Sequence, residues 1–173
     1  MSATGLEFAI AAVEIAAKGY TYKEMDCQAF VEAALRQVGY KNNWRGSNHM
    51  WREALSWKGT VEECVEAFGE VPVGAWLFTI KTDGGEKLRG YNDKEGNASH
   101  VGVYTGMGKG SVHSTTGGTQ EAAFPDPKRW THVGLCKLLD YDKEYIPTPQ
   151  EKIVTGLHQI MNIVEGLLDG ITP

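Results

Sequence analysis

One cysteine stands where its chemistry could be used. Cys27 directly follows Asp26 in the stretch MDCQAF, at the point where an amphipathic helical pattern begins. A thiol at a helix N-terminus faces unpaired backbone N–H groups and the positive end of the helix dipole, and both favour the thiolate. The position therefore indicates a nucleophile with a lowered pKa. The competing interpretation is a small buried hydrophobic residue, which is the commoner role of a single cysteine.

Two histidines offer a base for this thiol. The stretch SHVGVYTGMGKGSVHS predicts two strands joined by a Gly-rich turn at 106–110, with His100 opening the first strand and His113 in the second. An antiparallel hairpin would make these residues cross-strand neighbours. One imidazole could then take the thiol proton while the other fixes its orientation and tautomer. The alternatives are two unrelated polar strand residues, or a zinc site, which lacks closely spaced ligand pairs here.

Helical patterns come first along the chain. Apolar periodicity predicts a helix over 5–18 and a second helix that begins at Cys27, with Asp26 as its N-cap. Two further helices are predicted, one behind a Ser47 cap and running through Leu55, and one behind the capping box Thr60 to Glu63.

Strand patterns follow the helices. They are predicted at 74–81, 100–106, 111–116 and 132–141. Helices followed by strands predict an α+β domain, with N-terminal helices packed on a central antiparallel sheet. The segment 81–99, rich in turn-forming residues, is either a solvated loop or a flap over a site.

Four stretches of this chain resemble one enzyme family. DCQAFVEAALRQVG, VPVGAWLF, HVGVYTGMGKGSVHS and WTHVGLCKLLDY are similar to segments of the NlpC-type cell-wall cysteine peptidases, over about residues 6–141. The resemblance implies a papain-like fold and cleavage of peptidoglycan stem peptides, at a bond that contains D-Glu, through a thioester intermediate. It assigns Cys27 as nucleophile, His100 as general base, His113 as the orienting residue and Tyr22 as an oxyanion ligand. The chain departs from the family pattern at Gln28 and Ala29, where serine and glycine are usual.

Two other functions remain open from the sequence. The related CHAP-type amidases or endopeptidases also pair cysteine with histidine, but they commonly complete the site with an acidic residue and asparagine. A domain of the same fold could instead bind the cell wall without catalysis. The presence of Cys27, His100 and His113 together favours the peptidase.

Substrate-binding residues are predicted in two places. Trp44 and Arg45 precede a helix, where an aromatic wall and a carboxylate clamp would suit an acidic D-amino-acid peptide. A surface turn with a packed tryptophan is the alternative. Asp26 could receive a substrate amine in addition to capping its helix.

Composition excludes several classes of partner. The 173 residues carry a net charge of −5 without a basic run, so neither nucleic acid nor an anionic membrane surface is an expected partner. No stretch is apolar enough for a membrane span, and the N-terminal run lacks the pattern of a signal peptide. We therefore expect synthesis in the cytoplasm and action on the cell wall after release or by another route. The chemistry requires no metal or other cofactor.

The chain is predicted to divide near residue 145. Residues 1–145 form the expected peptidase domain, and 146–173 a linker followed by an amphipathic helix over 149–169. The apolar residues of that helix alternate at spacings of four and three, which is typical of a packing seam. The seam would dock on the domain or allow self-association between chains.

Overall fold

The computed structural model describes residues 2–81 and 93–141, which fall within one compact unit, Met1–Lys143. Its helices are α1 (Gly5–Ala16), α2 (Cys27–Gln37), α3 (Ser47–Glu53) and α4 (Val61–Phe68). Its strands are β1 (Leu55–Thr60), β2 (Trp76–Lys81), β3 (Asn97–Tyr104), β4 (Gly110–Thr115), β5 (Gly118–Ala123) and β6 (His132–Cys136). The helix predicted over 149–169 and most of the loop predicted over 81–99 lie outside the described residues.

The six strands form one sheet in the order β1-β6-β2-β3-β4-β5. Every neighbouring pair within it is antiparallel. The predicted α+β class with an antiparallel sheet is therefore confirmed.

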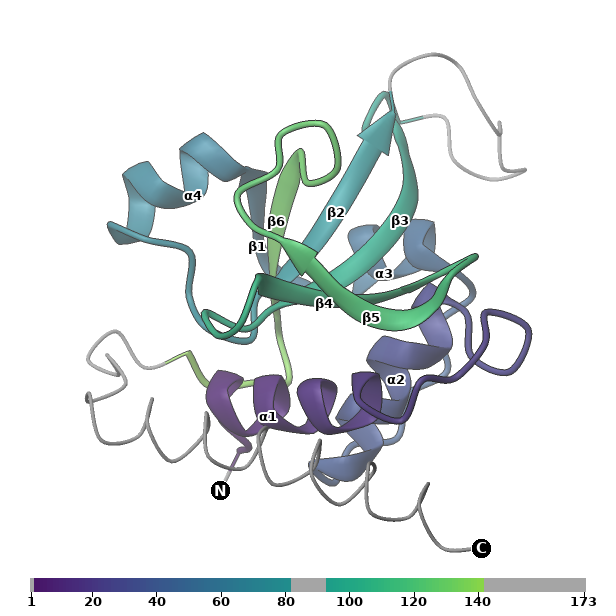
Figure 1. Cartoon of the computed structure of the whole chain (residues 1–173). Coiled ribbons are helices and arrows are strands. Elements are labelled where there is room, and N and C mark those ends of the chain that lie inside the picture. The colour runs from purple at the N-terminus through teal and green to yellow at the C-terminus, as the bar shows by residue number, and fades with distance from the viewer. Residues whose placement is uncertain (1, 82–92, 142–173) are drawn as a thin grey trace, which may run out of the picture. The chain divides into compact units, whose positions relative to one another are not determined.

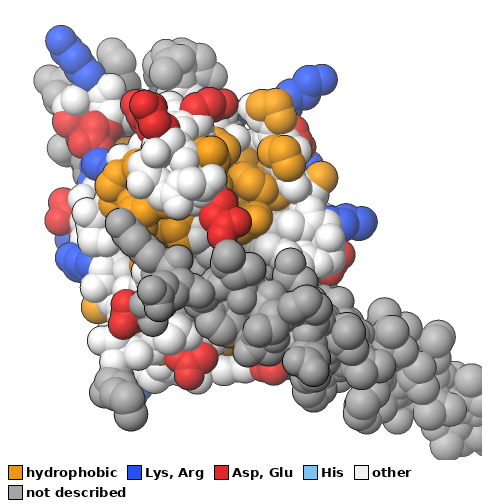
Figure 2. All heavy atoms as spheres, turned by 90° about the vertical axis from the view of Figure 1, so that its left-hand side faces the viewer, with side chains coloured by type: hydrophobic (Ala, Val, Ile, Leu, Met, Phe, Trp, Pro, Cys, Tyr) orange, Lys and Arg blue, Asp and Glu red, His pale blue; other side chains and the backbone are white. Residues whose placement is uncertain are grey.

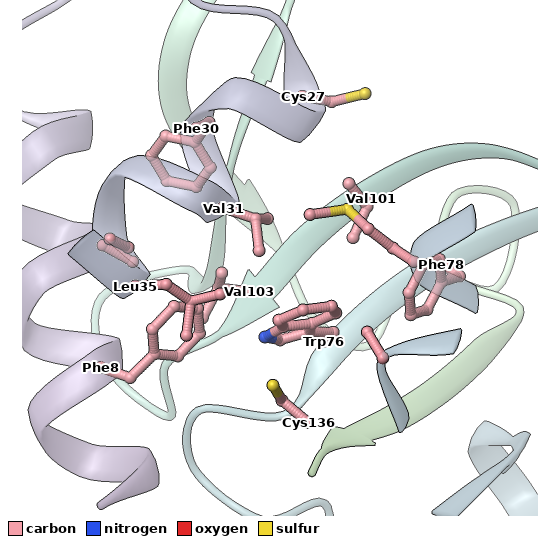
Figure 3. Packing of buried hydrophobic residues seen from close by; sticks show 14 of the residues in the cluster. Phe8, Cys27, Phe30, Val31, Leu35, Trp76, Phe78, Val101, Val103 and Cys136 are labelled. Atoms are coloured by element: carbon pink, nitrogen blue, oxygen red, sulfur yellow. The ribbon is translucent and has the colours of Figure 1, made fainter. Parts of the chain in front are cut away.

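Side-chain alternation along β2 separates the two faces of the sheet. Trp76 and Phe78 belong to a large apolar cluster with α1, α2 and α3, while Leu77 belongs to a second cluster that includes Cys64 of α4. Figure 1 shows α1 and α2 together on one side and α4 on the other. Figure 3 shows Phe30 and other α2 side chains within the first cluster. Burial on this face anchors α2, the helix that carries Cys27.

Most predicted helix starts are confirmed. α2 begins at Cys27, and Asp26 Oδ1 accepts a hydrogen bond from the Ala29 N–H at 2.8 Å. The predicted capping box at the start of α4 is also present. The predicted Ser47 cap is wrong: Gly46 occupies the N-cap position, and the Ser47 hydroxyl instead donates to the carbonyl of Ala98 at 2.6 Å.

Two strands were not predicted from the sequence. β1 follows α3 directly and includes Leu55, which helical periodicity had placed on the preceding helix. β5 has the sequence GTQEAA, with one β-branched residue and no aromatic residue. Both are edge strands of the sheet, held by pairing to β6 and β4. The predicted strand over 132–141 ends at Cys136, where the chain turns and the Leu139 N–H donates back to the Cys136 carbonyl.

Hydrophobic surface remains on the side of the molecule that carries α4. Figure 2 shows hydrophobic side chains grouped there, and Val65 of α4 is 43% exposed. Among the described residues, no helix is both long enough and apolar enough to cross a membrane.

Candidate active site

Cys27 is the first residue of α2, and it lies at the edge of the apolar core. Figure 3 shows its sulfur directed away from Phe30 and Val31. The Tyr22 hydroxyl donates to the sulfur at 3.9 Å, and the backbone N–H groups of Val101 and Gln28 also donate to it. These donors come from three parts of the chain, so the thiol sits in a site built by tertiary structure.

The N–H of Val101 is available because β3 separates from β4 at this point. The Tyr104 N–H donates to the carbonyl of Ala75, so the even-numbered residues of β3 direct their backbone groups toward β2. Val101 consequently directs its N–H toward the β4 side. The pairing of β3 with β4 extends only as far as Gly102 opposite His113, so the Val101 N–H lies beyond the ladder and binds the sulfur. The residue next to Val101 in the chain is His100.

The two histidines meet across the β3–β4 hairpin, as predicted. His113 is directly opposite Gly102, so His100 is its diagonal neighbour on the same face. His100 Nε2 and His113 Nδ1 are 2.9 Å apart. A bulge between β2 and β3 lies immediately before His100, and such bulges reorient neighbouring side chains. His113 is fully buried, so its contact with His100 is shielded from solvent.

Trp130 packs against both histidines. Its ring stacks on His100 at 5.6 Å between centroids and meets His113 edge-on at 5.4 Å. The indole N–H donates to the Ser111 hydroxyl at 3.1 Å, which fixes the ring. A Cβ at Gly102 would lie 2.6 Å from the Trp130 ring, so glycine is required for this packing. Sequence reasoning did not assign Trp130 to the site.

Arg129 is a second site residue that the sequence did not reveal. Its Nη1 donates to His113 Nε2 at 3.1 Å, and its Nε lies 3.6 Å from Asp126 Oδ2. The Thr79 hydroxyl donates to the Arg129 carbonyl at 2.5 Å, which ties this segment to β2. The only sequence signal was a pair of basic residues, Lys128 and Arg129, before the last strand. Nothing in their spacing indicates that one of them faces a histidine.

Burial is the largest cause of the pKa shifts of Cys27, His100 and His113. It raises the pKa of the Cys27 thiol, against the weaker lowering effects of the Val101 N–H and the Tyr22 hydroxyl. Burial also lowers the pKa of His100 to about 4, helped by the charge of Arg129. The pKa of His113 falls to about 3, through burial and then the charges of His100 and Arg129. The helix position alone predicted a lowered thiol pKa, but in the structure desolvation outweighs it.

A pocket of about 680 Å³ opens beside His100. Its lining consists of Tyr22, Thr79, Lys81, Ser99, His100, Thr115, Thr116, Asp126, Lys128 and Arg129. Hydroxyl groups and three cations face it, against a single carboxylate among these lining residues. Tyr22 is 38% exposed, and burial together with the nearby Cys27 raises its pKa to about 12. Tyr22 therefore remains a hydrogen-bond donor at neutral pH.

The predicted substrate-binding residues lie elsewhere. Trp44 is 7% exposed and packs edge-on against Trp76 at 5.4 Å, which agrees with the packing alternative. Arg45 is exposed, and its backbone N–H donates to His49 Nδ1 at 3.0 Å. Neither residue is part of the lining of the pocket beside His100. Asp26 is exposed and acts as the helix cap.

The other two cysteines have structural positions. Cys64 and Cys136 are fully buried in the two apolar clusters, and burial raises the pKa of each thiol to about 11. Over residues 2–81 and 93–141, no three His, Cys, Asp or Glu side chains are grouped so as to hold a metal ion. Cys27 differs from Cys64 and Cys136 because a side-chain hydroxyl, that of Tyr22, donates to its sulfur.

Comparison of the chain with protein-family models, with curated proteins and with solved structures gives no match.

Proposed function

We propose that this chain is a cysteine peptidase of the NlpC type that hydrolyses peptidoglycan stem peptides, and that it acts on the cell wall after release. The observation that carries the proposal is the 2.9 Å contact between His100 Nε2 and His113 Nδ1, with His100 adjacent in the chain to a donor of the Cys27 sulfur. A nucleophile at a helix start and a base held by a third polar residue form the arrangement expected of a catalytic triad.

In the proposed mechanism, the Cys27 thiol transfers its proton to His100 and its sulfur attacks the scissile carbonyl carbon. The carbonyl oxygen becomes an oxyanion, for which the Cys27 backbone N–H and the Tyr22 hydroxyl are the proposed donors. His100 then gives the proton to the leaving amine as the C–N bond breaks, which leaves a thioester on Cys27. A water molecule then attacks the thioester carbonyl while His100 accepts one of its protons, the C–S bond breaks to release the acid, and His100 returns the proton to the Cys27 sulfur.

The fold supports the proposal at a coarser level. α2 starts at the nucleophile and packs on an antiparallel sheet whose hairpin carries the histidine pair, an organisation compatible with a papain-like domain. The proposed substrate is a peptide with an acidic D-residue next to the scissile bond, because Lys81, Lys128 and Arg129 line the pocket beside His100.

The decisive experiment is digestion of purified muropeptides followed by mass analysis of the products. The wild-type chain should release stem-peptide fragments, and Cys27→Ala should release none. Cys27→Ser is a matched control of similar volume that should also be inactive or nearly so. Because Cys27 is partly packed, both variants are checked for an unchanged thermal unfolding midpoint.

The products also separate the alternatives. Cleavage between the sugar and the stem peptide would identify an amidase and overturn the endopeptidase proposal. Binding of intact peptidoglycan without any product, equal in wild type and Cys27→Ala, would identify a binding domain.

A further inference from the structure

The tautomers of the histidine pair follow from the contact with Arg129. A guanidinium carries only donors and stays charged, so His113 Nε2 must be the acceptor of the 3.1 Å hydrogen bond from Arg129 Nη1. A neutral His113 then has its hydrogen on Nδ1. That hydrogen is donated to His100 Nε2 at 2.9 Å, so a neutral His100 has its own hydrogen on Nδ1.

This arrangement opposes the action of His100 as a base. With Nε2 occupied as an acceptor and Nδ1 already protonated, His100 has no free lone pair for the thiol proton of Cys27. The productive state needs His113 to accept at Nδ1 and to carry its hydrogen on Nε2. In that state His113 Nε2–H and Arg129 Nη1–H would be two donors facing each other, so Arg129 must leave His113 before the base can act.

An anion that enters the pocket can draw the Arg129 guanidinium away from His113. Its side chain is 41% exposed and lines the pocket together with Lys81 and Lys128. Asp126 lies near Nε, at 3.6 Å, so the guanidinium can pivot about that end while Nη1 and Nη2 turn toward the pocket. A carboxylate binds two parallel N–H groups of arginine better than a single imidazole nitrogen does, because the hydrogen bonds are charge-assisted and bidentate.

We propose that Arg129 is a ligand-operated positioning residue: a carboxylate in the pocket draws it away from His113 and thereby frees the histidine pair to act as base. Across this change one proton leaves His100 Nδ1 to pocket water, the shared proton passes from His113 Nδ1 to His100 Nε2, and one proton reaches His113 Nε2. The proposal rests on the assignment of Cys27 and His100 as nucleophile and base. It makes the free carboxylate of the substrate a condition for catalysis as well as for binding.

The first test reads the tautomers directly, by 15N NMR of histidine-labelled full-length protein. In the free protein, His113 should carry its hydrogen on Nδ1. Added glutarate, a simple dicarboxylate, should move it to Nε2, whereas uncharged glutaramide should not. Arg129→Gln should show a changed pattern without glutarate, while Lys128→Gln, which removes a neighbouring charge, should keep the wild-type pattern. An unchanged pattern with glutarate up to its solubility limit, or in Arg129→Gln, would overturn the proposal.

The second test uses peptides that differ only in whether this carboxylate is free or amidated. Wild type should prefer the free acid in kcat as well as in KM, and Arg129→Gln should lose that preference. Its kcat on the amidated peptide should equal or exceed the wild-type value, because the restraint on His113 is gone. A residue that only binds the carboxylate would change KM alone, and that result would contradict the proposal. If the tautomers respond as expected but neither peptide is cleaved, the peptidase assignment fails while the control of the histidine pair by Arg129 stands.

Discussion

At the scale of single residues, the site depends on hydrogen-bond direction more than on the identity of its three central side chains. His113 is fully buried and contacts His100 on one ring nitrogen and Arg129 on the other. In the proposed mechanism, the same imidazole therefore favours or opposes catalysis, depending on which nitrogen carries the hydrogen. This makes His113 the most informative residue to replace.

We predict different outcomes for two substitutions at His113. His113→Asn offers an amide oxygen that accepts from His100 Nε2–H, and it can also accept from Arg129, so the variant should keep measurable turnover. His113→Leu has comparable bulk but no acceptor, so the His100 ring loses its orientation and kcat should fall on the order of 10² or more. Peptide-digestion kinetics measure both, with thermal unfolding as the check on folding. Equal activity of the two variants would place His113 outside the mechanism.

The sequence located the three residues of the proposed triad but missed the two that contact its histidines. Cys27, His100 and His113 were recognisable because helix starts, strand patterns and Gly-rich turns are local signals. Arg129 and Trp130 lie after β5 in the chain and reach the histidines only through the folded sheet. The raised pKa of Cys27 was missed for the same reason, since burial is a property of the tertiary structure and not of the helix start.

At the scale of elements, Asp26 at the start of α2 affects both the position of the Cys27 sulfur and the pKa of its thiol. Asp26 caps the helix through its contact with the Ala29 N–H and thereby fixes the position of the sulfur. Its negative charge also raises the pKa of the adjacent thiol. The cap and the charge can be separated because asparagine is as good an N-cap as aspartate.

We predict that Asp26→Asn shifts the reactivity of Cys27 without affecting stability. Removing the charge lowers the thiol pKa, so the pH profile of iodoacetamide labelling should move to lower pH. Urea unfolding should change by only a few tenths of a kcal/mol. Asp26→Ala removes the charge and the cap together, so it should show the same direction of shift and lose about 1 kcal/mol of stability. A labelling profile that stays in place, or moves to higher pH, would contradict the role given to the Asp26 charge.

Elements that depend on local signals were predicted better than those that depend on pairing. The α2 and α4 starts follow from cap residues that act within four positions of the chain. β5 has weak strand propensity, and both β1 and β5 are held by the backbone partners that β6 and β4 offer them. Tertiary contact also explains the wrong cap prediction at Ser47, because its hydroxyl donates a hydrogen bond to the Ala98 carbonyl of β3 and does not cap the helix.

At the scale of the whole molecule, the two ends of the described unit are tied together. The Gly5 N–H donates to the Asp140 carbonyl at 2.8 Å, and the Asp140 N–H donates to the Ala3 carbonyl at 2.9 Å. The Tyr141 hydroxyl accepts from the Cys136 N–H at 3.0 Å and donates to the Gly74 carbonyl at 3.2 Å. These contacts complete the packing around the start of α1, so the folded unit needs the chain up to Tyr141.

We therefore predict different behaviour for two truncated chains. A chain of residues 1–145 keeps all of these contacts and should unfold cooperatively and retain peptide cleavage. A chain of residues 1–138 loses the hydrogen bonds of Asp140 and Tyr141. It leaves backbone groups of the buried residues Gly5, Gly74 and Cys136 unsatisfied, at about 1–3 kcal/mol for each group. Its thermal midpoint, followed by circular dichroism, should fall well below that of the longer chain. Equal midpoints would show that the contacts at residues 140 and 141 are dispensable.

The comparison of 1–145 with the full chain then tests the apolar seam predicted over 149–169, because a seam that packs must change either the thermal midpoint or the mass in sedimentation velocity. If the full chain matches 1–145 in both, residues 146–173 act only as a linker.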